Sequence, residues 1–399
     1  MALWRAIDNS YQAATRRLIQ VQSNNAIKVA RRDQSPDFSL APVVIALEPG
    51  EPLEVDPTVW QDAVRQLSRV FLDYPAVMDS NVRFVAEDEL LYLLNSEGTR
   101  IQHRRTKVRI LMWAQTIAED GMVLQIHDIA YATHPEHLPE VEALEARVRQ
   151  LCERLTALRL APLVDPTTAP AILRGRAAAV FFHEVLGHRV EGHRQKDEDE
   201  SQTFRDKIGE VLMPSFLSVF DDPTLTSWEG TELNGHYRFD DEGVAAERTD
   251  IVTEGQLQGF LLSRSPVEGF ERSNGHGRRQ PGSAVVARQG NLVITASQTL
   301  SHEELRDRLL EEIQRQDKPF GLLFDDISGG FTFTGRVTPN AYSVRPVSVW
   351  KVYPDGREDE LVRGVDLIGT PLATLDEILA ASEKTEVFNG SCGAESGWV

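Results

Sequence analysis

The sequence predicts an α+β protein with an N-terminal α/β domain, containing an antiparallel meander and flanking helices, and a C-terminal, mainly antiparallel β domain that is barrel-like. Three observations support this fold class. The chain has 399 residues, more than one hydrophobic core usually organises. Apolar residues alternate strongly between Val82 and Ala132, as in antiparallel strands. A Pro-rich, non-periodic stretch at 160–170 separates two regions whose sequence patterns differ, so we expect domains over 1–165 and 166–399.

The N-terminal domain begins with helical patterns. From Ala2 to about Asp33 the apolar residues recur at steps of three and four, which indicates an amphipathic helix. Further helices are expected near Pro57–Leu72 and at about Pro139–Leu160. Between these two, the alternating stretch contains turn signals at Asn95–Gly98 and Glu119–Gly121, so it should form an antiparallel meander.

The C-terminal domain should start with a short strand at Ala171–Arg174 that leads into an apolar helix. Many short strands then follow, separated by Gly, Asp and Pro. This density of strands favours an antiparallel sheet curled towards a barrel, with the apolar helix packed against it. Two helices are expected to interrupt the strands, at Ser301–Gln316 and Thr374–Ser382. In the first of them, Ser301 and Glu304 have the spacing of a capping box.

Composition and charge exclude several classes of protein. The formal net charge is −19, whereas a nucleic-acid partner would require a basic face, so we expect no nucleic-acid binding. The apolar run at Ala177–Phe182 is too short to cross a membrane, and the N-terminus lacks the pattern of a secretory signal. The only cysteines, Cys152 and Cys392, lie in such different settings that a disulfide is not expected. A cytoplasmic protein without membrane contact is the prediction.

The most informative segment is AAAVFFHEVLGHRVEGH at 177–193. Two imidazoles, His183 and His188, flank Glu184 directly after an apolar run. Neutral imidazole nitrogens bind zinc while one position stays open for water, and a carboxylate beside the first ligand can take a proton from that water and pass it to the leaving amine. The segment therefore predicts a hydrolytic zinc site with Glu184 as its catalytic base.

The histidine spacing differs from the HExxH pattern of many zinc proteases. A separation of four residues turns a helix by about 400°, which leaves the side chains nearly in register, whereas the five-residue separation here leaves them about 140° apart. Both rings can reach one ion only if the helix ends or distorts between them. Because glycine tolerates such a break best, we expect a kink or helix end at Gly187.

Alternative interpretations remain open from the residues alone. A lone HExxxH arises by chance in unrelated chains, and a buried His–Glu pair can be hydrogen-bonded without a metal. A catalytic zinc also requires a third protein ligand, for which Glu191, His193, the acidic run Asp197–Glu200 and Cys392 are candidates. Cys392 is favoured, because a thiol in the polar, glycine-flanked segment FNGSCGAESGW is poorly explained by core packing, whereas Cys152 is well explained in that way.

Several separate motifs resemble the TldD/PmbA family of zinc metallopeptidases. They are HEVLGHRVEG at 183–192, SNGHGRR at Ser273–Arg279, GSCG around Cys392 and the hairpin-like Phe239–Arg264. The resemblance covers most of 80–399. It implies that His183, His188 and Cys392 hold Zn2+ and that Glu184 is catalytic, as in the HExxxH-containing, TldD-like subunit. Because family members carry additional segments at both ends, the resemblance also implies a shortened relative or a fragment.

The resemblance further implies a peptide substrate and a paired assembly, either a homodimer or a heterodimer with a related subunit. His193, His236 and His276 are candidates for stabilising an oxyanion, although single histidines are more often structural. Arg278 and Arg279 are candidates for holding a peptide carboxylate, with solvated charge as the competing interpretation. The strands near 284–287 and 292–295 could add an extended peptide at a sheet edge, with ordinary pairing inside a sheet as the favoured interpretation. The alternative function is a non-catalytic peptide- or partner-binding subunit with a structural or absent metal.

Overall fold

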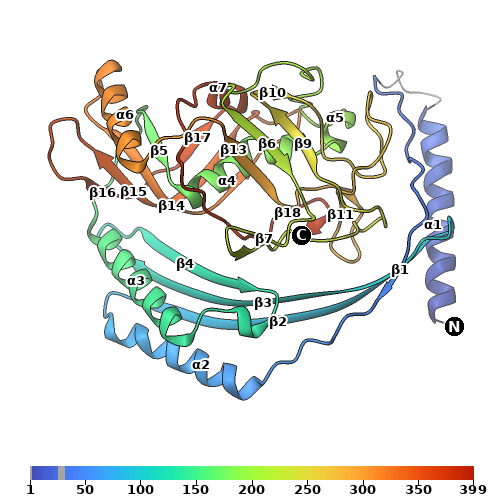
Figure 1. The fold of residues 1–399 in the computed structure, drawn as a ribbon, viewed down its shortest axis with the longest axis horizontal. Helices are drawn as coiled ribbons and strands as arrows, with labels where there is room; N and C mark the ends of the chain where they lie inside the picture. The colour runs from blue at the N-terminus through green and yellow to red at the C-terminus, as the bar shows by residue number, and fades with distance from the viewer. Residues whose placement is uncertain (1, 26–31) are drawn as a thin grey trace.

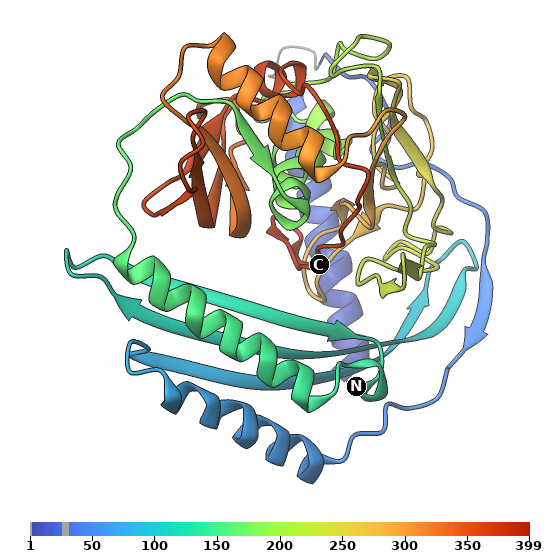
Figure 2. The ribbon, with the colours of Figure 1, turned by 60° about the vertical axis from the view of Figure 1, so that its left-hand side comes forward.

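Two layers face each other in the computed structural model, which describes residues 2–25 and 32–399. A long curved sheet with two helices beneath it lies opposite a larger body (Figure 1). Figure 2 shows both layers from another side, with the C-terminus on the side of the body that faces the sheet. In chain order the elements of the first part are α1 (Ala2–Asn25), β1 (Ile45–Glu48), α2 (Pro57–Val70), the 3-10 turn η1 (Phe71–Asp73), β2 (Asp79–Leu94), β3 (Arg100–Ile117), β4 (Val123–Ala132), the 3-10 turn η2 (Pro135–His137) and α3 (Val141–Leu160).

The predicted antiparallel meander is confirmed. β2 pairs with β3 along its whole length, from Asp79 opposite Gln115 to Leu94 opposite Arg100, and β3 pairs with β4. Gly98 and Gly121 close the two turns with φ of 106° and 87°, a region that side chains other than glycine rarely adopt. β1 adds a short parallel strand at the start of β3. The helices α2 and α3 cover the outer face of the sheet (Figure 2).

The predicted first helix is confirmed over Ala2–Asn25, the bounds of α1. Residues 26–31 of the expected helix lie outside the described residues, and Asp33, its expected end, is not helical. The carboxylate of Asp33 instead accepts hydrogen bonds from the backbone N–H groups of Ser35, at 2.8 Å, and Glu268, at 3.1 Å. Bonding of this kind to nearby backbone favours loop over helix.

The second part is richer in strands, most of them short. Its elements are β5 (Ala171–Leu173), α4 (Gly175–Val185), the 3-10 turn η3 (Gly187–Val190), α5 (His193–Lys196), β6 (Leu217–Asp221), β7 (Ser227–Trp228), β8 (Thr231–Glu232), β9 (Thr249–Thr253), β10 (Gln256–Leu257), β11 (Gly277–Arg278), β12 (Val286–Ala287), β13 (Leu292–Ala296), α6 (His302–Arg315), β14 (Gly321–Thr332), β15 (Tyr342–Val352), β16 (Glu360–Val362), β17 (Leu367–Gly369), α7 (Pro371–Asp376), β18 (Gly393–Ala394) and β19 (Gly397–Trp398).

The predicted barrel-like closure of this part is wrong. One sheet has the order β10-β9-β6-β13, and a second has β16-β15-β14-β5 with β17 also paired to β15. A barrel requires every strand to pair on both sides, whereas β10, β13, β16 and β5 end these two sheets among the described residues. The remaining strands form two-residue pairs, too short to join the sheets into one.

Of the helices predicted in the second part, α4 and α6 are confirmed, whereas α7 has different bounds. α4 packs against β14 and β15 as expected. α6 begins with the predicted capping box between Ser301 and Glu304. The helix expected at Thr374–Ser382 instead spans Pro371–Asp376, because proline, which suits the first helical turn, starts it earlier.

Each layer has its own large hydrophobic cluster, and ion pairs connect the two layers. One cluster lies between the meander, α2 and α3, and includes the fully buried Cys152; the other lies around α4 and the two sheets of the body. Arg154 on α3 pairs with Asp326 on β14 at 2.6 Å, and Arg264 pairs with Glu97 in the β2–β3 turn at 2.6 Å.

The domain division at 165/166 remains a prediction. Within the described residues, no helix is long and apolar enough to cross a membrane.

Candidate metal centre

The HExxxH segment changes conformation between its two histidines, as its spacing predicts. α4 ends at Val185, and the 3-10 turn η3 begins at Gly187. Gly187 also lies against another segment: a Cβ there would be 2.1 Å from Oε1 of Gln289. No side chain fits at this position without displacing Gln289, so the glycine serves both the break in the helix and this close approach.

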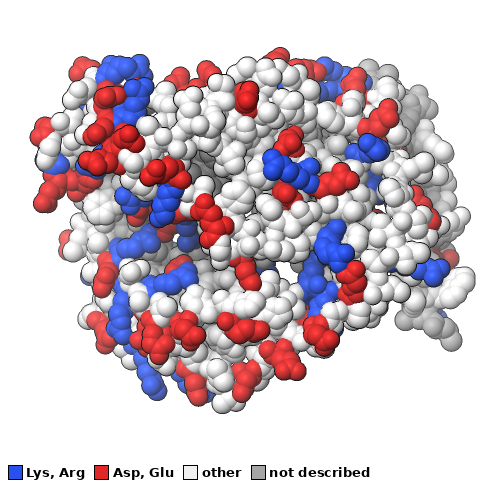
Figure 3. All heavy atoms as spheres, in the orientation of Figure 1, with Lys and Arg blue, Asp and Glu red and all other residues white. Residues whose placement is uncertain are grey.

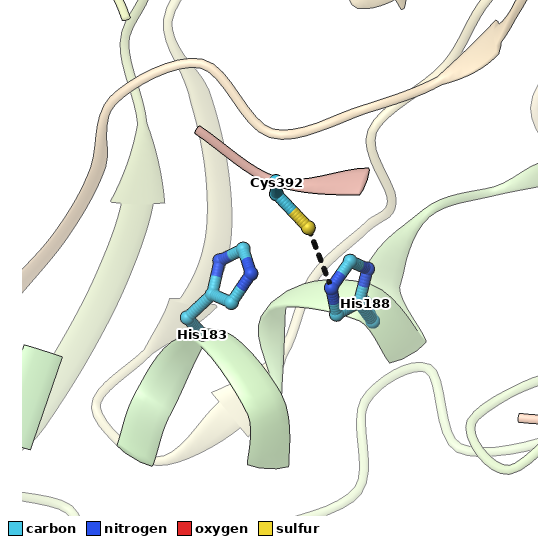
Figure 4. A group of neighbouring side chains, drawn as sticks. All are labelled: His183, His188 and Cys392. Atoms are coloured by element: carbon cyan, nitrogen blue, oxygen red, sulfur yellow. Dashed lines mark hydrogen bonds between the residues drawn. The ribbon is translucent and has the colours of Figure 1, made fainter. Parts of the chain in front are cut away.

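Three donor groups converge at this break. The ligand atoms of His183, His188 and Cys392 all lie within 4.8 Å of one another. Figure 4 shows the Cys392 thiol between the two rings, with Sγ 3.2 Å from Nε2 of His188. Cys392 comes from the other end of the chain, directly before the β18–β19 hairpin, and its backbone pairs with Val399. Among the described residues, these three form the one group arranged to hold a metal ion.

Each histidine is oriented through its second ring nitrogen. Nδ1 of His183 lies 3.0 Å from Oε1 of Gln289, and Nδ1 of His188 lies 3.2 Å from Oε1 of Glu191. These bonds leave both Nε2 atoms for the centre, as is usual for metal-binding histidines. Sequence reasoning did not identify Gln289, which lies in the connection between β12 and β13, and no motif marks it.

Glu191, one candidate for the third ligand, instead orients His188 and pairs with two arginines. It is fully buried, accepts a hydrogen bond from Nε of Arg194 at 2.8 Å, and forms an ion pair with Arg288, whose Nε lies 3.2 Å from Oε1. Burial alone would raise the pKa of its carboxyl group, but His188 and the two arginines lower it overall. Arg288 also donates to the carbonyl oxygen of Cys392 at 3.1 Å. This buried arginine, also unidentified from the sequence, therefore connects the cysteine segment to the partner of His188.

Two other candidates for the third ligand, His193 and Glu200, are bonded to side chains outside the centre. His193 is bonded to Glu395 at 2.5 Å, and Glu200 of the acidic run pairs with Arg194 at 2.9 Å. The thiol of Cys392 has the opposite environment: burial favours its neutral form, but hydrogen bonds from His183 and His188 outweigh burial and lower its pKa to about 5. A thiol with this pKa is a thiolate at neutral pH, the form that binds metals.

The carboxylate of Glu184 lies beside the three donors. The residue is 4% exposed, and its Oε2 is buried without a hydrogen-bond partner among the described residues. Burial raises its pKa, while the neighbouring His183 and His188 act in the opposite direction. Gly330 on β14 allows this packing, because a Cβ there would lie 2.7 Å from Cγ of Glu184.

A cavity of about 3610 Å³ connects this centre to the concave face of the meander. His183, Glu184, His188 and Cys392 line it, as do His236, Arg278 and Arg279. His276 is fully buried instead: its Nε2 lies 3.2 Å from Asp221, and its Nδ1 lies 2.9 Å from the side-chain oxygen of Asn274. Figure 3 shows Lys and Arg gathered along the hollow between the layers.

A family model for the PmbA/TldA metallopeptidase C-terminal domain matches residues 166–396. The chain belongs to the PmbA/TldD family. A metalloprotease of Methanothermobacter thermautotrophicus is 28% identical over 322 residues, covering 79% of this chain and 65% of that protein. The metalloprotease TldD homolog of Haemophilus influenzae is 27% identical over 230 residues, covering 57% of this chain and 43% of that protein.

Solved structures share the PmbA/TldD fold with this chain. A modulator of DNA gyrase from Thermotoga maritima superposes with a TM-score of 0.64 at 17% identity, covering 87% of this chain and 76% of that one. TldE from Thermococcus kodakarensis gives a TM-score of 0.58, with the same identity and coverage. The chain spans 65, 61 and 54% of the length of three archaeal metalloproteases that it matches.

Proposed function

We propose that this chain is a zinc-dependent peptidase that hydrolyses peptide bonds in unfolded or small peptides. His183, His188 and Cys392 are the proposed ligands, and Glu184 is the proposed catalytic base. The observation that carries the proposal is the convergence of three donor atoms within 4.8 Å beside a buried carboxylate oxygen that has no partner among the described residues. Membership of a metallopeptidase family supports the same reading.

The residues fit a zinc ion chemically. Two imidazole nitrogens and one thiolate are ligands that suit zinc, and three protein ligands leave a fourth position open, as in catalytic rather than structural sites. The lowered pKa of Cys392 favours the ionised ligand without an added base. The bonds from Gln289 and Glu191 hold both imidazoles in the tautomer that presents Nε2.

Glu184 and its surroundings supply the acid–base chemistry. When bound, zinc would polarise the scissile carbonyl and make the attacking water more acidic. Oε2 of Glu184 takes the proton of that water and then transfers it to the amine that leaves. Because burial raises the pKa of this carboxyl group, its proton affinity is closer to that needed for both transfers near neutral pH.

The alternative function, a non-catalytic binding subunit, is less well supported. A structural zinc would need a fourth protein ligand, but Glu191 is held by two arginines and His193 by Glu395. A scaffold also gives no reason for the unpaired oxygen of Glu184. Assembly as a homodimer or with a related subunit belongs to the proposal, supported by the likeness in fold to TldE, and so does a cytoplasmic location.

Removal of the metal tests this function directly. The purified chain, loaded with zinc, is expected to cleave an unfolded protein or a mixture of short peptides into fragments detectable by mass spectrometry. Treatment with a chelator should abolish cleavage, and added zinc should restore it, because the metal would both polarise the scissile carbonyl and acidify the water from which Glu184 takes a proton. Bound zinc without cleavage of any peptide, in a chain that remains folded, would favour the non-catalytic alternative.

Gly187→Ala should weaken zinc binding without unfolding the protein. The new methyl group would lie 2.1 Å from Oε1 of Gln289 and displace this flexible side chain from Nδ1 of His183. Loss of such a supporting contact typically lowers metal affinity by about 10- to 100-fold, which competition with a zinc-sensitive dye measures. Gln289→Ala is the matched variant and should have the same effect; unchanged affinity in both would show that Gln289 does not support the site.

A further inference from the structure

We propose that Lys107 and Arg278 form a subsite that binds a carboxylate group of the peptide substrate next to the metal centre. The inference rests on the proposed peptidase function and adds to it the chemical class of group that the cavity selects. Lys107 comes from the curved sheet and Arg278 from the body, so the subsite exists only where the two layers meet.

Lys107 lies on β3 and lines the cavity. It shares one face of the strand with Arg105 and Arg109, because residues two apart in a strand point to the same side. Its Nζ lies 3.3 Å from Oγ of Ser391, the residue before the proposed ligand Cys392, and 5.8 Å from the centre of the Tyr131 ring.

Arg278 lies on β11, in the opposite wall of the cavity. One guanidinium nitrogen, NH1, donates to the carbonyl oxygen of Gln289 at 2.7 Å, and the group lies 4.9 Å from the centre of the Tyr237 ring. Gln289 is the residue that orients His183. Each cation therefore contacts a residue that adjoins or orients a proposed metal ligand, so a group bound between them lies close to the scissile bond.

Neither cation has a carboxylate partner within 4.0 Å among residues 2–25 and 32–399. Of the acidic groups around them, Asp241 and Glu87 are paired with other cations, whereas Glu89, which also acts on Lys107, is exposed to solvent. Asp241 pairs with Arg105 at 3.3 Å and accepts from the backbone N–H of Arg279 at 2.8 Å. Glu87 pairs with Arg109 at 3.1 Å. The chain has a net charge of −19, yet beside the centre it places two partly buried cations that have no carboxylate partner among the described residues.

Burial disfavours the charged forms of Lys107 and Arg278 as long as no anion is bound between them. Burial, followed by repulsion from Arg109, lowers the pKa of Lys107, and burial also lowers the pKa of Arg278. Unpaired buried charges are costly, and a bound carboxylate would remove this cost. Arginine can hold a carboxylate through two parallel hydrogen bonds, while lysine adds a point charge. The carboxylate can be the free C-terminus of a peptide or an Asp or Glu side chain.

Peptide binding to the full chain in its zinc-loaded Glu184→Gln form tests the subsite without turnover. Three labelled peptides of equal length are compared: a neutral peptide with an amidated C-terminus, the same peptide with a free C-terminal carboxylate, and the amidated peptide with one internal Glu. We expect at least one carboxylate-bearing peptide to bind about tenfold or more tightly than the neutral one. Preference for the free-acid peptide alone identifies the C-terminus as the source, and preference for the Glu peptide alone identifies a side chain.

Variants then assign this preference to the two cations. Lys107→Met and Arg278→Gln should each reduce it to about twofold or less, and Lys107→Arg should restore most of it. Lys384→Met and Arg308→Gln are matched controls that should leave it unchanged, because these cavity-lining residues pair with Glu386 and Glu311. Zinc content and circular dichroism establish that each variant is folded.

The outcomes separate this inference from the proposed function. Equal binding of the three peptides, no binding of any of them, or a preference that survives both substitutions overturns the subsite. If wild-type chain nevertheless cleaves the neutral peptide, the peptidase function stands without it. If the preference exists and depends on both cations but no zinc-loaded wild-type chain cleaves any peptide, the subsite stands and the peptidase function falls.

Discussion

Glu184→Gln is expected to abolish peptide hydrolysis while leaving one zinc per chain in place. The substitution keeps the shape of the side chain but removes the group that accepts a proton, and loss of a general base typically slows a reaction by about 10²- to 10⁴-fold. Zinc should remain, because the three proposed ligands do not include Glu184. The measurements are peptide cleavage by mass spectrometry and zinc content by plasma mass spectrometry on the same sample.

Stability provides an internal check on this variant. Oε2 of Glu184 is buried and has no hydrogen-bond partner in the part of the chain that the structure describes. Exchange for a neutral amide removes a buried charge, so the melting temperature should be unchanged or higher. Glu383→Gln is the matched control, since Glu383 is an exposed residue at the edge of the same cavity; its activity should equal that of wild type. Activity of Glu184→Gln equal to wild type would refute the proposed role of Glu184.

Cys392→Ser should lose zinc as well as activity. A serine hydroxyl is a poor zinc ligand compared with a thiolate, and the lowered pKa of Cys392 indicates that wild type supplies the thiolate at neutral pH. We expect zinc content to fall from about one ion per chain to below about 0.1 after dialysis. Plasma mass spectrometry of the dialysed proteins measures this directly.

Cys152→Ala controls for the loss of a thiol. Cys152 is fully buried in the cluster around the meander, so its removal should lower stability slightly without affecting zinc content. If Cys392→Ser retained a full equivalent of zinc, the third ligand would have to be another residue. Glu191 would be the first to examine, because a carboxylate oxygen already lies 3.2 Å from His188; it would have to leave His188 and its arginines to bind the ion.

The local part of the fold was predictable because its causes lie close together in the chain. The alternation over 82–132 and its glycine turns identify the meander, since strand period and turn chemistry are local properties. The same holds for the capping box of α6 and for the helix end near Gly187, which follows from histidine spacing. Barrel closure failed as a prediction because it depends on which distant strands pair, and the sheets here end at β10, β13, β16 and β5.

The sequence by itself determined the identity of the proposed centre, because the chemistry of His183, Glu184, His188 and Cys392 is a property of their side chains and of a few recognisable motifs. Only the tertiary structure brought Cys392 to the histidines from more than 200 residues away and supplied Gln289, Glu191 and Arg288 as their supports. It also placed Lys107 of one layer beside the cysteine segment of the other. Such contacts arise from the packing of two layers through buried clusters and ion pairs, and packing between distant segments leaves no periodic signal in the chain.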